Sequence, residues 1–389
     1  MNKIICLNPL SIEGLQLLPK SYEIVEDLSQ ATGVLVRSAN MKDLKLPASL
    51  LAIARAGAGV NNIPINQCAE KGIVVFNTPG ANANGVVESV IAGMLIAARD
   101  IVGGINWVKA NSAQKDIASL VEKNKKQFSG TELLGKKLGV IGLGAIGYRI
   151  ANAAIGLGME VYGYDPFIPV KCAWNLSRHV KHVDYLENLL KNCDYITIHV
   201  PLNHKTEKLI NKEAFEKLKD GAILLNYSRD KLVDEDALEE ALESKKLRKY
   251  VTDFPNDRIV NLKNIIAIPH LGASTEEAED NCAVMAVEEL KDYIDNGNIT
   301  NSVNYPDCSL GALKKPVRLA VAHKNIPNML GKLTVLLGNK GVNIADMISK
   351  SRGEYAYALF DLDRDIPLEI LNSIKDIDGV IKVRTLALE

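Results

Sequence analysis

The segment GVIGLGAIG, residues 139–147, restricts the fold of this chain more than any other stretch of the sequence. It ends a hydrophobic run and leads directly into a helical pattern, YRIANAAIGLG. Its glycines have G-x-G-x-x-G spacing and are Gly142, Gly144 and Gly147. Glycine here lets the backbone turn sharply and approach a pyrophosphate, which then lies at a helix N-terminus whose unpaired N–H groups favour anions. The segment therefore predicts a strand, a phosphate-binding turn and a helix.

An acidic residue, Asp165, ends the next predicted strand, 18 residues after Gly147. A carboxylate at that position binds the ribose hydroxyls of a dinucleotide and repels a 2′-phosphate. The alternative is that the glycines only allow close packing and that Asp165 caps the turn YDP. Because strand, loop, helix and acid agree, the sequence favours a dinucleotide site for NAD rather than NADP.

Short β-type runs alternate with helix-compatible segments along most of the chain, which is typical of βαβ units with a parallel sheet. One series occupies the first 80 residues, and a second runs from KKLGVIGLGAIG to NIIAIPH, where it ends near residue 270. We expect a long helix over 277–297, closed by Gly297, to return the chain to the first domain. After a polar linker, the remaining residues read as βαββαβ.

The predicted fold is therefore α/β, with two Rossmann-like, doubly wound parallel-sheet domains and a C-terminal βαββαβ domain. We expect a substrate-binding domain in residues 1–97 and 281–305, an NAD-binding domain in 98–280, and a regulatory domain in 314–389.

Composition excludes several functional classes. A formal net charge of −1 gives no long-range attraction for nucleic acid or an anionic membrane. The longest apolar run, VIAGMLIAA, is too short for a bilayer, which requires about 20 residues. Six scattered cysteines without CxxC spacing indicate reduced thiols and no zinc or other metal site. We therefore expect a cytoplasmic protein that acts on a small molecule.

A histidine, His270, follows the last β-type run in the segment IIAIPHLGAST. Hydride transfer between nicotinamide and an alcohol carbon needs a group that accepts or donates the hydroxyl proton, and histidine titrates in the required range. Arg229 follows another strand and can hold a carboxylate with two parallel hydrogen bonds. A carboxylate after the strand KYVTDF can fix the histidine tautomer. Since ligands of open α/β sheets bind at the carboxyl ends of strands, these groups form a candidate active site.

The chain resembles the D-2-hydroxyacid dehydrogenase family in the motifs GLGAIG with Asp165, HVPL, NYSR, TDF and PHLGAST. With the C-terminal domain included, it resembles the phosphoglycerate dehydrogenase branch of that family. The resemblance implies NAD-dependent oxidation of a D-hydroxy acid, with His270 as acid/base and Arg229 as the substrate-orienting residue. In the family, the acid that supports the histidine belongs to a DVFxxEP motif. This chain has TDFPNDRIV instead, and the nearest acidic match in it is Asp257. Asp230 stands where the family usually has glycine.

The same resemblance implies the remaining site residues. The cofactor-binding set comprises Gly142, Gly144, Ala145, Ile146, Gly147, Asp165, Val200, Tyr227, Ser228, Asp253, Gly272 and Ala273. The substrate-binding set comprises Arg37, Ser38, Arg55, Gly57, Ala58 and Arg229, of which Arg37 and Arg55 provide cations for a phosphorylated acid. Salt bridging at the sheet ends is the alternative role of these two arginines.

The C-terminal domain looks like an ACT domain, a fold that pairs across subunits and binds amino acids. Its resemblance implies L-serine as an effector at His323, Asn325 and Asn343, and a homodimer or homotetramer. In the loop after Pro327, this chain has Asn328 where ACT domains of this kind usually have glycine. The alternative is a module that only oligomerises.

Two other functions fit parts of the sequence. A glyoxylate or hydroxypyruvate reductase, or another D-2-hydroxyacid dehydrogenase, would use the same chemistry, but the ACT-like domain and the pair Arg37 and Arg55 argue against it. An NAD-sensing scaffold protein would keep the fold without the reaction, but the presence of both His270 and Arg229 argues against it.

Overall fold

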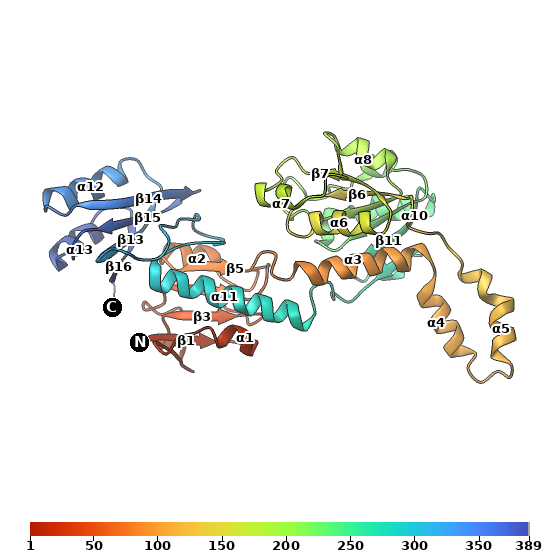
Figure 1. Cartoon of the computed structure of the whole chain (residues 1–389), viewed down its shortest axis with the longest axis horizontal. Coiled ribbons are helices and arrows are strands. Elements are labelled where there is room, and N and C mark those ends of the chain that lie inside the picture. The colour runs from red at the N-terminus through yellow and green to blue at the C-terminus, as the bar shows by residue number, and fades with distance from the viewer. Residues whose placement is uncertain (388–389) are drawn as a thin grey trace. The chain divides into compact units, whose positions relative to one another are not determined.

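The computed structural model describes residues 1–387 and divides them into two compact units. Unit 1 comprises Met1–Asn82 and Glu276–Glu389, and unit 2 comprises Ala83–Thr275. Each unit is built around its own parallel sheet, and unit 1 also carries a small antiparallel sheet (Figure 1). This confirms the predicted fold class.

Unit 2 contains a seven-stranded sheet with the order β12-β11-β10-β9-β6-β7-β8, and its paired strands are parallel. The strands are β6 (Lys137–Ile141), β7 (Glu160–Tyr164), β8 (Lys181–His182), β9 (Tyr195–Ile198), β10 (Ala222–Asn226), β11 (Leu247–Thr252) and β12 (Ile265–Ala267). All the β-type runs predicted for this region form strands, and β8 was not predicted.

Helices cover both faces of this sheet. They are α3 (Ala83–Ala98), α6 (Gly147–Gly156), α7 (Val170–Asn175), α8 (Leu186–Asn192), α9 (Lys212–Lys217) and α10 (Glu235–Glu243), with short 3-10 turns η3 (Asp230–Leu232) and η4 (Ile259–Asn261). The central strand β10 shows why its sequence is a continuous apolar run. Ile223 and Leu225 enter the core that includes α3 and α6, whereas Ala222 and Leu224 enter the core on the opposite face.

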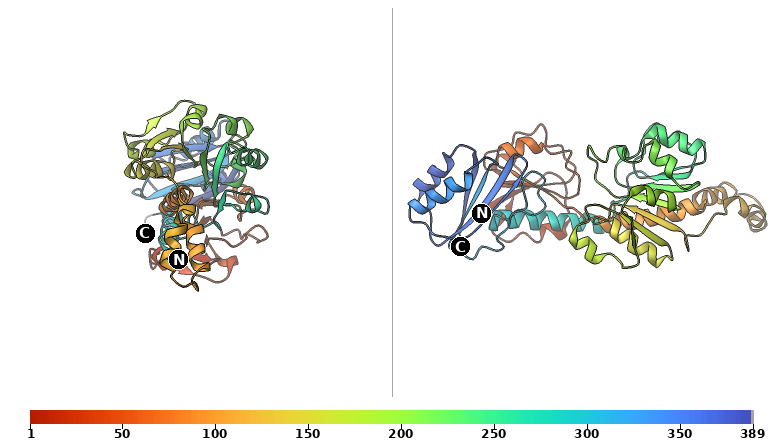
Figure 2. Two further views of the ribbon diagram at one scale, coloured as in Figure 1. Left: turned by 90° about the vertical axis from the view of Figure 1, so that its right-hand side faces the viewer. Right: turned by 90° about the horizontal axis from the view of Figure 1, so that it is seen from above.

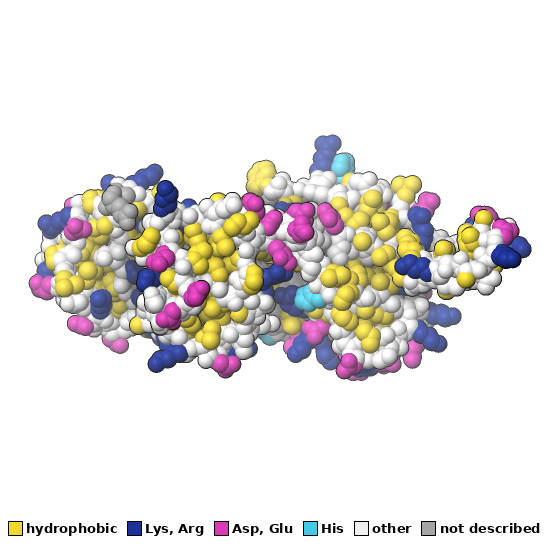
Figure 3. All heavy atoms as spheres, turned by 90° about the horizontal axis from the view of Figure 1, so that it is seen from below, with side chains coloured by type: hydrophobic (Ala, Val, Ile, Leu, Met, Phe, Trp, Pro, Cys, Tyr) yellow, Lys and Arg dark blue, Asp and Glu magenta, His cyan; other side chains and the backbone are white. Residues whose placement is uncertain are grey.

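The apolar pattern of residues 87–108 favours one long helix, but the structure divides it between two helices. Between α3 and α4 (Ile101–Ala110), the side chain of Asp100 caps α4 by accepting a hydrogen bond of 3.0 Å from the amide of Gly103. Helix α4, α5 (Ile117–Asn124) and η2 (Lys125–Phe128) form an arm that extends away from the sheet of unit 2 (Figure 1), and charged side chains gather at its outer end (Figure 3). Within residues 1–387, no helix is both long enough and apolar enough to cross a membrane.

Unit 1 begins with a five-stranded sheet in the order β2-β1-β3-β4-β5, whose neighbouring strands are parallel. Its elements are β1 (Asn2–Cys6), α1 (Ile12–Leu15), β2 (Tyr22–Ile24), η1 (Leu28–Gln30), β3 (Gly33–Val36), β4 (Ala52–Arg55), α2 (Ile65–Glu70) and β5 (Val74–Asn77). The long helix α11 (Glu276–Asn296) packs its buried face on this sheet and ends before Gly297, whose φ is 72°. The predicted helix and its glycine stop are confirmed.

The C-terminal part of unit 1 is a βαββαβ module with a four-stranded antiparallel sheet in the order β14-β15-β13-β16. Two helices lie on one face of this sheet (Figures 1 and 2). The elements are β13 (Val317–Lys324), α12 (Met329–Asn339), β14 (Ile344–Arg352), β15 (Tyr355–Leu362), α13 (Leu368–Lys375) and β16 (Val380–Ala387). The order predicted from the sequence is confirmed.

The module binds the C-terminal end of α11. Backbone carbonyls there have no partner within the helix, so they need donors from elsewhere. Arg384 donates to the carbonyls of Tyr293 and Ile294, at 3.2 and 2.8 Å, and Arg318 donates to that of Asn296 at 2.8 Å. One hydrophobic core also runs from the parallel sheet through α11 into β13 and β15. The module and the first sheet are therefore continuous parts of one unit.

Helix α11 buries a titratable side chain, Glu289. Its pKa is raised to about 8, mainly by burial. A 2.7 Å hydrogen bond from Asn301 to Oε1 acts to lower this pKa, and the nearby charges of Asp307 and Glu288 act to raise it. Its Oε2 has no hydrogen-bond partner in the described part of the chain. Because the folded-state pKa lies above the ordinary 4.5, this group favours folding at low pH, and that contribution is lost as the pH rises toward 8.

We expect Glu289→Gln to stabilise the protein at high pH, because glutamine removes the buried charge. The gain in unfolding free energy should exceed about 1 kcal/mol at about pH 9 and be smaller at about pH 5. Urea denaturation at both pH values measures it. The neighbouring Glu288→Gln, at an exposed position, is the control and should show no comparable gain. A gain that does not depend on pH would contradict the burial of an ionisable Glu289.

Candidate active site

The glycine turn between β6 and α6 has three different backbone requirements. Gly142 has a φ of 89°, and a Cβ there would lie 2.5 Å from the carbonyl oxygen of His199. Gly147 is in close contact with the carbonyl of Gly142, which also leaves no room for a side chain. At Gly144 a Cβ would meet nothing within 4 Å, so this part of the turn is open. The first and third glycines thus shape the turn, and the second leaves its backbone accessible.

The start of α6 is suited to an anion. Its N-cap residue, Ile146, makes no side-chain capping hydrogen bond, and the turn residues 144–146 are only partly buried. N–H groups at a helix N-terminus carry partial positive charge. The predicted strand, turn and helix are all present, and together they can hold a pyrophosphate.

Asp165 lies at the end of β7, next to this turn. Its Oδ2 accepts a hydrogen bond of 2.8 Å from the amide of Leu143, and its Oδ1 accepts one of 2.8 Å from the amide of Phe167. The carboxylate therefore lies beside the turn, where we expect the ribose of NAD.

The strand order places this turn at the reversal point of the sheet. The chain passes from β6 to β7 and β8 on one side, and then returns to β9 on the other side of β6. Open α/β sheets bind ligands at such a point. Val200 follows β9 and would be 2.9 Å from a Cβ on Gly142. Ser228 joins the neighbouring strand end through a 2.7 Å hydrogen bond to the carbonyl of Ile198, and Tyr227 before it is buried.

The predicted chemical groups follow three neighbouring parallel strands. In the register of the sheet, Asn226 of β10 pairs with Thr252 of β11, and Thr252 pairs with Ala267 of β12. Arg229 and His270 each come three residues after this row. Both side chains are exposed at the same edge of the sheet. The structure thus brings together the strand ends that carry them.

Asn226, which is fully buried, holds the turn that carries Arg229. Its Nδ2 donates to the carbonyl of Arg229 at 2.8 Å, and its Oδ1 accepts from the amide of Ser228 at 3.1 Å. Its own carbonyl accepts a hydrogen bond of 3.3 Å from the amide of Asp253, the residue that follows β11. The backbone around Arg229 is therefore fixed from inside the sheet.

Asp253 in turn contacts the segment that carries His270. Its Oδ1 and Oδ2 accept hydrogen bonds from the amides of Leu271 and Gly272, at 2.7 and 2.9 Å. The ring of the next residue, Phe254, lies with its centroid 4.8 Å from that of His270. Ala273 is partly buried and packs on the core that includes α3.

Asp257, which the resemblance assigns as the supporting acid, lies in an exposed turn. Its backbone carbonyl accepts a hydrogen bond of 2.6 Å from Asn261. Side chains on either side tie the turn to α10, since Asn256 donates to Glu235 at 2.7 Å, and Arg258 pairs with Asp236 at 2.6 Å. The role of Asp257 remains a prediction.

The predicted substrate residues belong to unit 1 and follow its strands. The amides of Arg37, Ser38 and Ala39 all donate to Oδ1 of Asn8, at 2.9–3.0 Å. The guanidinium of Arg37 pairs with Glu279 of α11 at 2.5 Å, and both side chains are nearly half exposed. The side chain of Asn8 therefore fixes the backbone turn from which the Arg37 guanidinium extends.

Arg55, at the end of β4, adjoins this turn. Its Nε donates to the carbonyl of Arg37 at 3.0 Å, which joins the two predicted substrate cations. The amide of Gly57, whose φ is 143°, donates to Oγ1 of Thr78 at 2.8 Å, and the carbonyl of Ala58 accepts from Asn77 at 2.6 Å. The two arginines therefore lie within one hydrogen-bonded cluster at the strand ends of unit 1.

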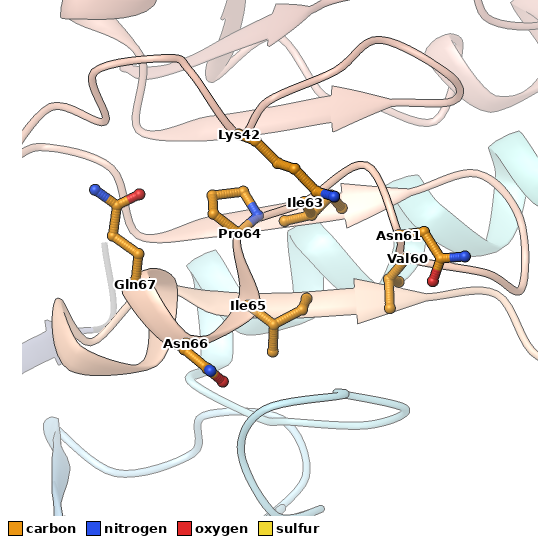
Figure 4. A pocket seen from close by; sticks show the side chains of 8 residues that line it. All are labelled: Lys42, Val60, Asn61, Ile63, Pro64, Ile65, Asn66 and Gln67. Atoms are coloured by element: carbon orange, nitrogen blue, oxygen red, sulfur yellow. The ribbon is translucent and has the colours of Figure 1, made fainter. Parts of the chain in front are cut away.

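A shallow cavity of about 480 Å³ also occurs in unit 1 (Figure 4). It is lined by Lys42, Val60, Asn61, Ile63, Pro64, Ile65, Asn66 and Gln67. None of the predicted substrate residues is in its lining, so it is separate from the cluster around Arg37.

The predicted effector residues lie in the C-terminal module. His323 on β13 is buried, its Nδ1 is 2.7 Å from the carbonyl of Lys324, and burial lowers its pKa. Asn325 donates to the carbonyl of Gly353 at 3.0 Å, and the carbonyl of Asn343 accepts from the amide of Asp363 at 3.3 Å. Asn328 has a φ of 61°, a left-handed conformation that asparagine tolerates, which explains why it can replace glycine there.

Sequence reasoning missed three residues that shape these sites: Asn8, Asn226 and Glu279. Asn8 and Asn226 each follow or end a predicted apolar strand, in CLNP and LLNY. A buried asparagine at the end of a strand can form hydrogen bonds with several backbone groups of the following turn. An asparagine after an apolar run could therefore have indicated these two residues. Glu279 gave no such signal, because its contact with Arg37 joins residues that are 242 positions apart.

Comparisons with known proteins agree with this geometry. Residues 91–272 match the family described as D-isomer specific 2-hydroxyacid dehydrogenase, NAD binding domain. The D-3-phosphoglycerate dehydrogenase of Methanocaldococcus jannaschii is 35% identical over 385 residues, covering 93% of this chain and 70% of that protein. The D-3-phosphoglycerate dehydrogenase of Escherichia coli (strain K12) is 34% identical over 351 residues, covering 87% of this chain and 82% of that protein.

A solved structure is also similar. The crystal structure of NAD⁺-bound 3-phosphoglycerate dehydrogenase from Entamoeba histolytica matches with a TM-score of 0.62 and 29% identity. The match covers 78% of this chain and 98% of that one.

Proposed function

The chain belongs to the D-isomer-specific 2-hydroxyacid dehydrogenase family of NAD-dependent enzymes, and we propose that it oxidises 3-phospho-D-glycerate to 3-phosphohydroxypyruvate. This reaction is the first step of L-serine biosynthesis. The proposal depends mainly on the sheet register of unit 2. The ends of β10, β11 and β12 are aligned at Asn226, Thr252 and Ala267. Arg229 and His270 follow these aligned ends and therefore lie at the same edge of the sheet. Relatives that act on phosphoglycerate by name match almost the whole chain, which supports the choice of substrate.

The residues at the reversal point of the sheet fit NAD. The open position at Gly144 and the uncapped N-terminus of α6 suit the pyrophosphate, and Asp165 suits the ribose. When bound, NAD supplies the nicotinamide ring that accepts the hydride. His270 takes the proton of the substrate hydroxyl, and Arg229 holds the substrate carboxylate and polarises the adjoining oxygen.

The phosphate group needs cations beyond Arg229. In the proposal, Arg37 and Arg55 supply them, because the two residues belong to one hydrogen-bonded cluster of unit 1, in which Arg55 donates to the carbonyl of Arg37. In the proposal, unit 2 acts as the NAD-binding domain that was predicted for residues 98–280, with α3 added to it. The parallel-sheet part of unit 1 acts as the substrate-binding domain that was predicted for residues 1–97 with 281–305. The six free thiols suit a reducing compartment, and we assign the enzyme to the cytoplasm.

Glu279 competes with the substrate for Arg37 in this scheme. We expect Glu279→Gln to lower the KM for 3-phosphoglycerate about two- to five-fold, because an exposed ion pair contributes up to about 1 kcal/mol. The kcat should be unchanged, since Glu279 has no role in the proposed proton transfer. Steady-state kinetics at low salt measure both constants. Glu277→Gln, at an exposed position two residues earlier on α11, is the control. An unchanged or higher KM in Glu279→Gln would remove Arg37 from the phosphate site.

The arm of unit 2 supports a homo-oligomer. Helix α4 exposes Ile101, Val102, Ile105 and Val108, each 44–49% accessible. The spacing of these residues places them on one side of the helix, and a contiguous apolar stripe of this kind marks an interface. In the proposal, a second copy of the chain covers this stripe in a homodimer or homotetramer, and light scattering of the purified protein gives the number of subunits.

The C-terminal module, residues 314–389, completes the proposal as an ACT-like regulatory domain. L-Serine, the end product, binds near His323, Asn325 and Asn343. The buried Nε2 of His323 has no hydrogen-bond partner among the described residues, which leaves a polar atom for a ligand.

A single assay tests the function. NADH formation is followed with 3-phosphoglycerate, glycerate, lactate and 2-hydroxyglutarate, each with and without L-serine. We expect 3-phosphoglycerate to give the highest kcat/KM and serine to lower the rate. Preference for glycerate would indicate a different dehydrogenase of the family, and no NADH with any acid would indicate an NAD-binding scaffold. An unchanged rate with serine would remove the effector role of the module.

A further inference from the structure

In the linker after α11, residues 301–304 lie antiparallel along β5, at the edge of the parallel sheet of unit 1. The amide of Val303 donates to the carbonyl of Val75 at 2.9 Å, and Oδ1 of Asn304 accepts from the amide of Val75 at 2.9 Å. A strand at the edge of a sheet otherwise leaves such backbone groups unpaired. The linker therefore completes this edge of the sheet.

Two other elements hold this segment. Asn301, whose φ is 59°, donates its amide to Asp307 at 2.9 Å and its Nδ2 to the buried Glu289 of α11 at 2.7 Å. Arg352 of β14 donates to the carbonyl of Ser302. Both α11 and the C-terminal module therefore contact the residues that pair with β5.

The segment meets the carboxyl end of β5 beside the predicted substrate turn. The carbonyl of Asn301 accepts a hydrogen bond of 3.4 Å from the amide of Asn77, the last residue of β5. Nδ2 of Asn77 donates to the carbonyl of Ala58 at 2.6 Å. The next residue, Thr78, accepts the amide of Gly57 on its Oγ1 at 2.8 Å and donates its own amide to the carbonyl of Gly57 at 3.2 Å. The two residues that end β5 thus hold the turn.

The bond from Asn77 fixes the direction of the peptide group between Ala58 and Gly59. In a trans peptide, the carbonyl and the following N–H point in opposite directions. Because the Ala58 carbonyl is bound to Asn77, the amide of Gly59 points away from Asn77, and it has no hydrogen-bond acceptor among residues 1–387. An unpaired amide in such a turn is a donor for an anion.

We infer that Asn301 is a positioning residue for the substrate turn, which it holds through Asn77 in the orientation that presents the Gly59 amide. The inference rests on the proposed role of this turn in substrate binding. Because Arg352 binds the same segment, the C-terminal module is connected to the turn within unit 1. We therefore expect changes in the module to alter the KM for the substrate rather than kcat.

The test is Asn301→Gly in the full-length protein. Glycine keeps the left-handed backbone but removes the bond to Glu289, so the end of the segment loosens. We expect the KM for 3-phosphoglycerate to rise about three- to tenfold, since the net loss of one hydrogen bond has an effect of this size. The kcat and the KM for NAD should stay within about twofold. A KM for 3-phosphoglycerate that does not rise, or that rises together with the KM for NAD, would overturn the inference.

Variants of Glu289 separate positioning from a general loss of stability. Glu289→Gln keeps an oxygen that accepts from Asn301, so its KM for 3-phosphoglycerate should resemble that of wild type. Glu289→Met has no acceptor and should reproduce the KM of Asn301→Gly. Equal KM values in the two Glu289 variants would show that the bond to Asn301 does not position the turn.

Asn264→Gly is the matched control. Asn264 also has a left-handed backbone, with a φ of 65°, and its carbonyl accepts the amide of Tyr250 at 3.1 Å. It is exposed and lies before β12 in unit 2, at the edge of the sheet opposite to Arg229 and His270. Its KM for 3-phosphoglycerate should be that of wild type, and a rise equal to that of Asn301→Gly would count against a specific role of Asn301.

Arg352→Met tests the connection to the module. Methionine lacks the donor that binds the carbonyl of Ser302, so the KM for 3-phosphoglycerate should rise in the same direction as in Asn301→Gly, with kcat retained. An unchanged KM would exclude the module from the positioning of the turn.

A further measurement does not need catalysis. Hydrogen exchange follows the amides of Gly57, Asn77 and Thr78 in wild type and Asn301→Gly. We expect these amides to exchange faster in the variant, while those of β3 exchange as in wild type. If wild type oxidises no acid, the proposed function fails, while hydrogen exchange still decides whether Asn301 holds the turn. Exchange at the wild-type rate in the variant would refute that role.

Discussion

His270→Asn should lower turnover by at least about 100-fold, because general acid/base catalysis contributes 10²–10⁴. Asparagine is chosen because it tolerates the left-handed backbone of this residue, whose φ is 50°, so the variant removes the titrating ring without changing the turn. Stopped-flow and steady-state rates of NADH formation measure the loss of turnover.

Binding of NAD separates this effect from a structural one. The dissociation constant for NAD should stay within about threefold of wild type, because the glycine turn and Asp165 belong to other strand ends of the sheet. His182→Asn, at an exposed histidine of β8, is the control and should leave turnover unchanged. Turnover of His270→Asn within tenfold of wild type would mean that another group transfers the proton.

The order of strands and helices was predictable from the sequence because its signals are local. The run AILL of residues 222–225 predicts β10, since a strand covered on both faces is apolar throughout. Gly297 predicts the end of α11, since glycine readily adopts the left-handed conformation that follows the last helical residue. The break between α3 and α4 was not predicted, because the apolar pattern continues through it. Only the capping bond of Asp100 to Gly103 marks the new helix, and a single aspartate in a helical pattern is a weak signal.

The active site was predictable to the level of strand ends, but not to the level of contacts. Arg229 and His270 were expected at one edge of the sheet because parallel strands present their carboxyl ends together. Which acid contacts the His270 segment depends on how the loop after β11 folds back, and the sequence distance from Asp253 to Gly272 does not reveal it. The ion pair of Arg37 with Glu279 likewise depends on where α11 packs. Such long-range contacts follow from tertiary packing rather than from local pattern.

The buried ion pair of Arg318 and Asp361 should be the most sensitive point of the C-terminal module. Nε and Nη2 of Arg318 donate to the two carboxylate oxygens of Asp361, at 2.6 and 3.0 Å, and the side chains are 0% and 9% exposed. Nη1 of Arg318 also donates to the carbonyls of Asn296 and Gly311, at 2.8 and 2.7 Å. The guanidinium thus joins the module to the end of α11.

Asp361→Ala should lower the unfolding free energy of unit 1 by about 3–5 kcal/mol, because it leaves a buried guanidinium without its counter-charge. Urea denaturation measures the change. Asp236→Ala is the matched control, since Asp236 pairs with Arg258 at the same 2.6 Å but with side chains that are 78% and 42% exposed. That pair should contribute no more than about 1 kcal/mol. If the two variants lose similar stability, the Arg318 pair is solvated in solution, and the connection between the module and α11 depends on the apolar contacts of β13 and β15 instead.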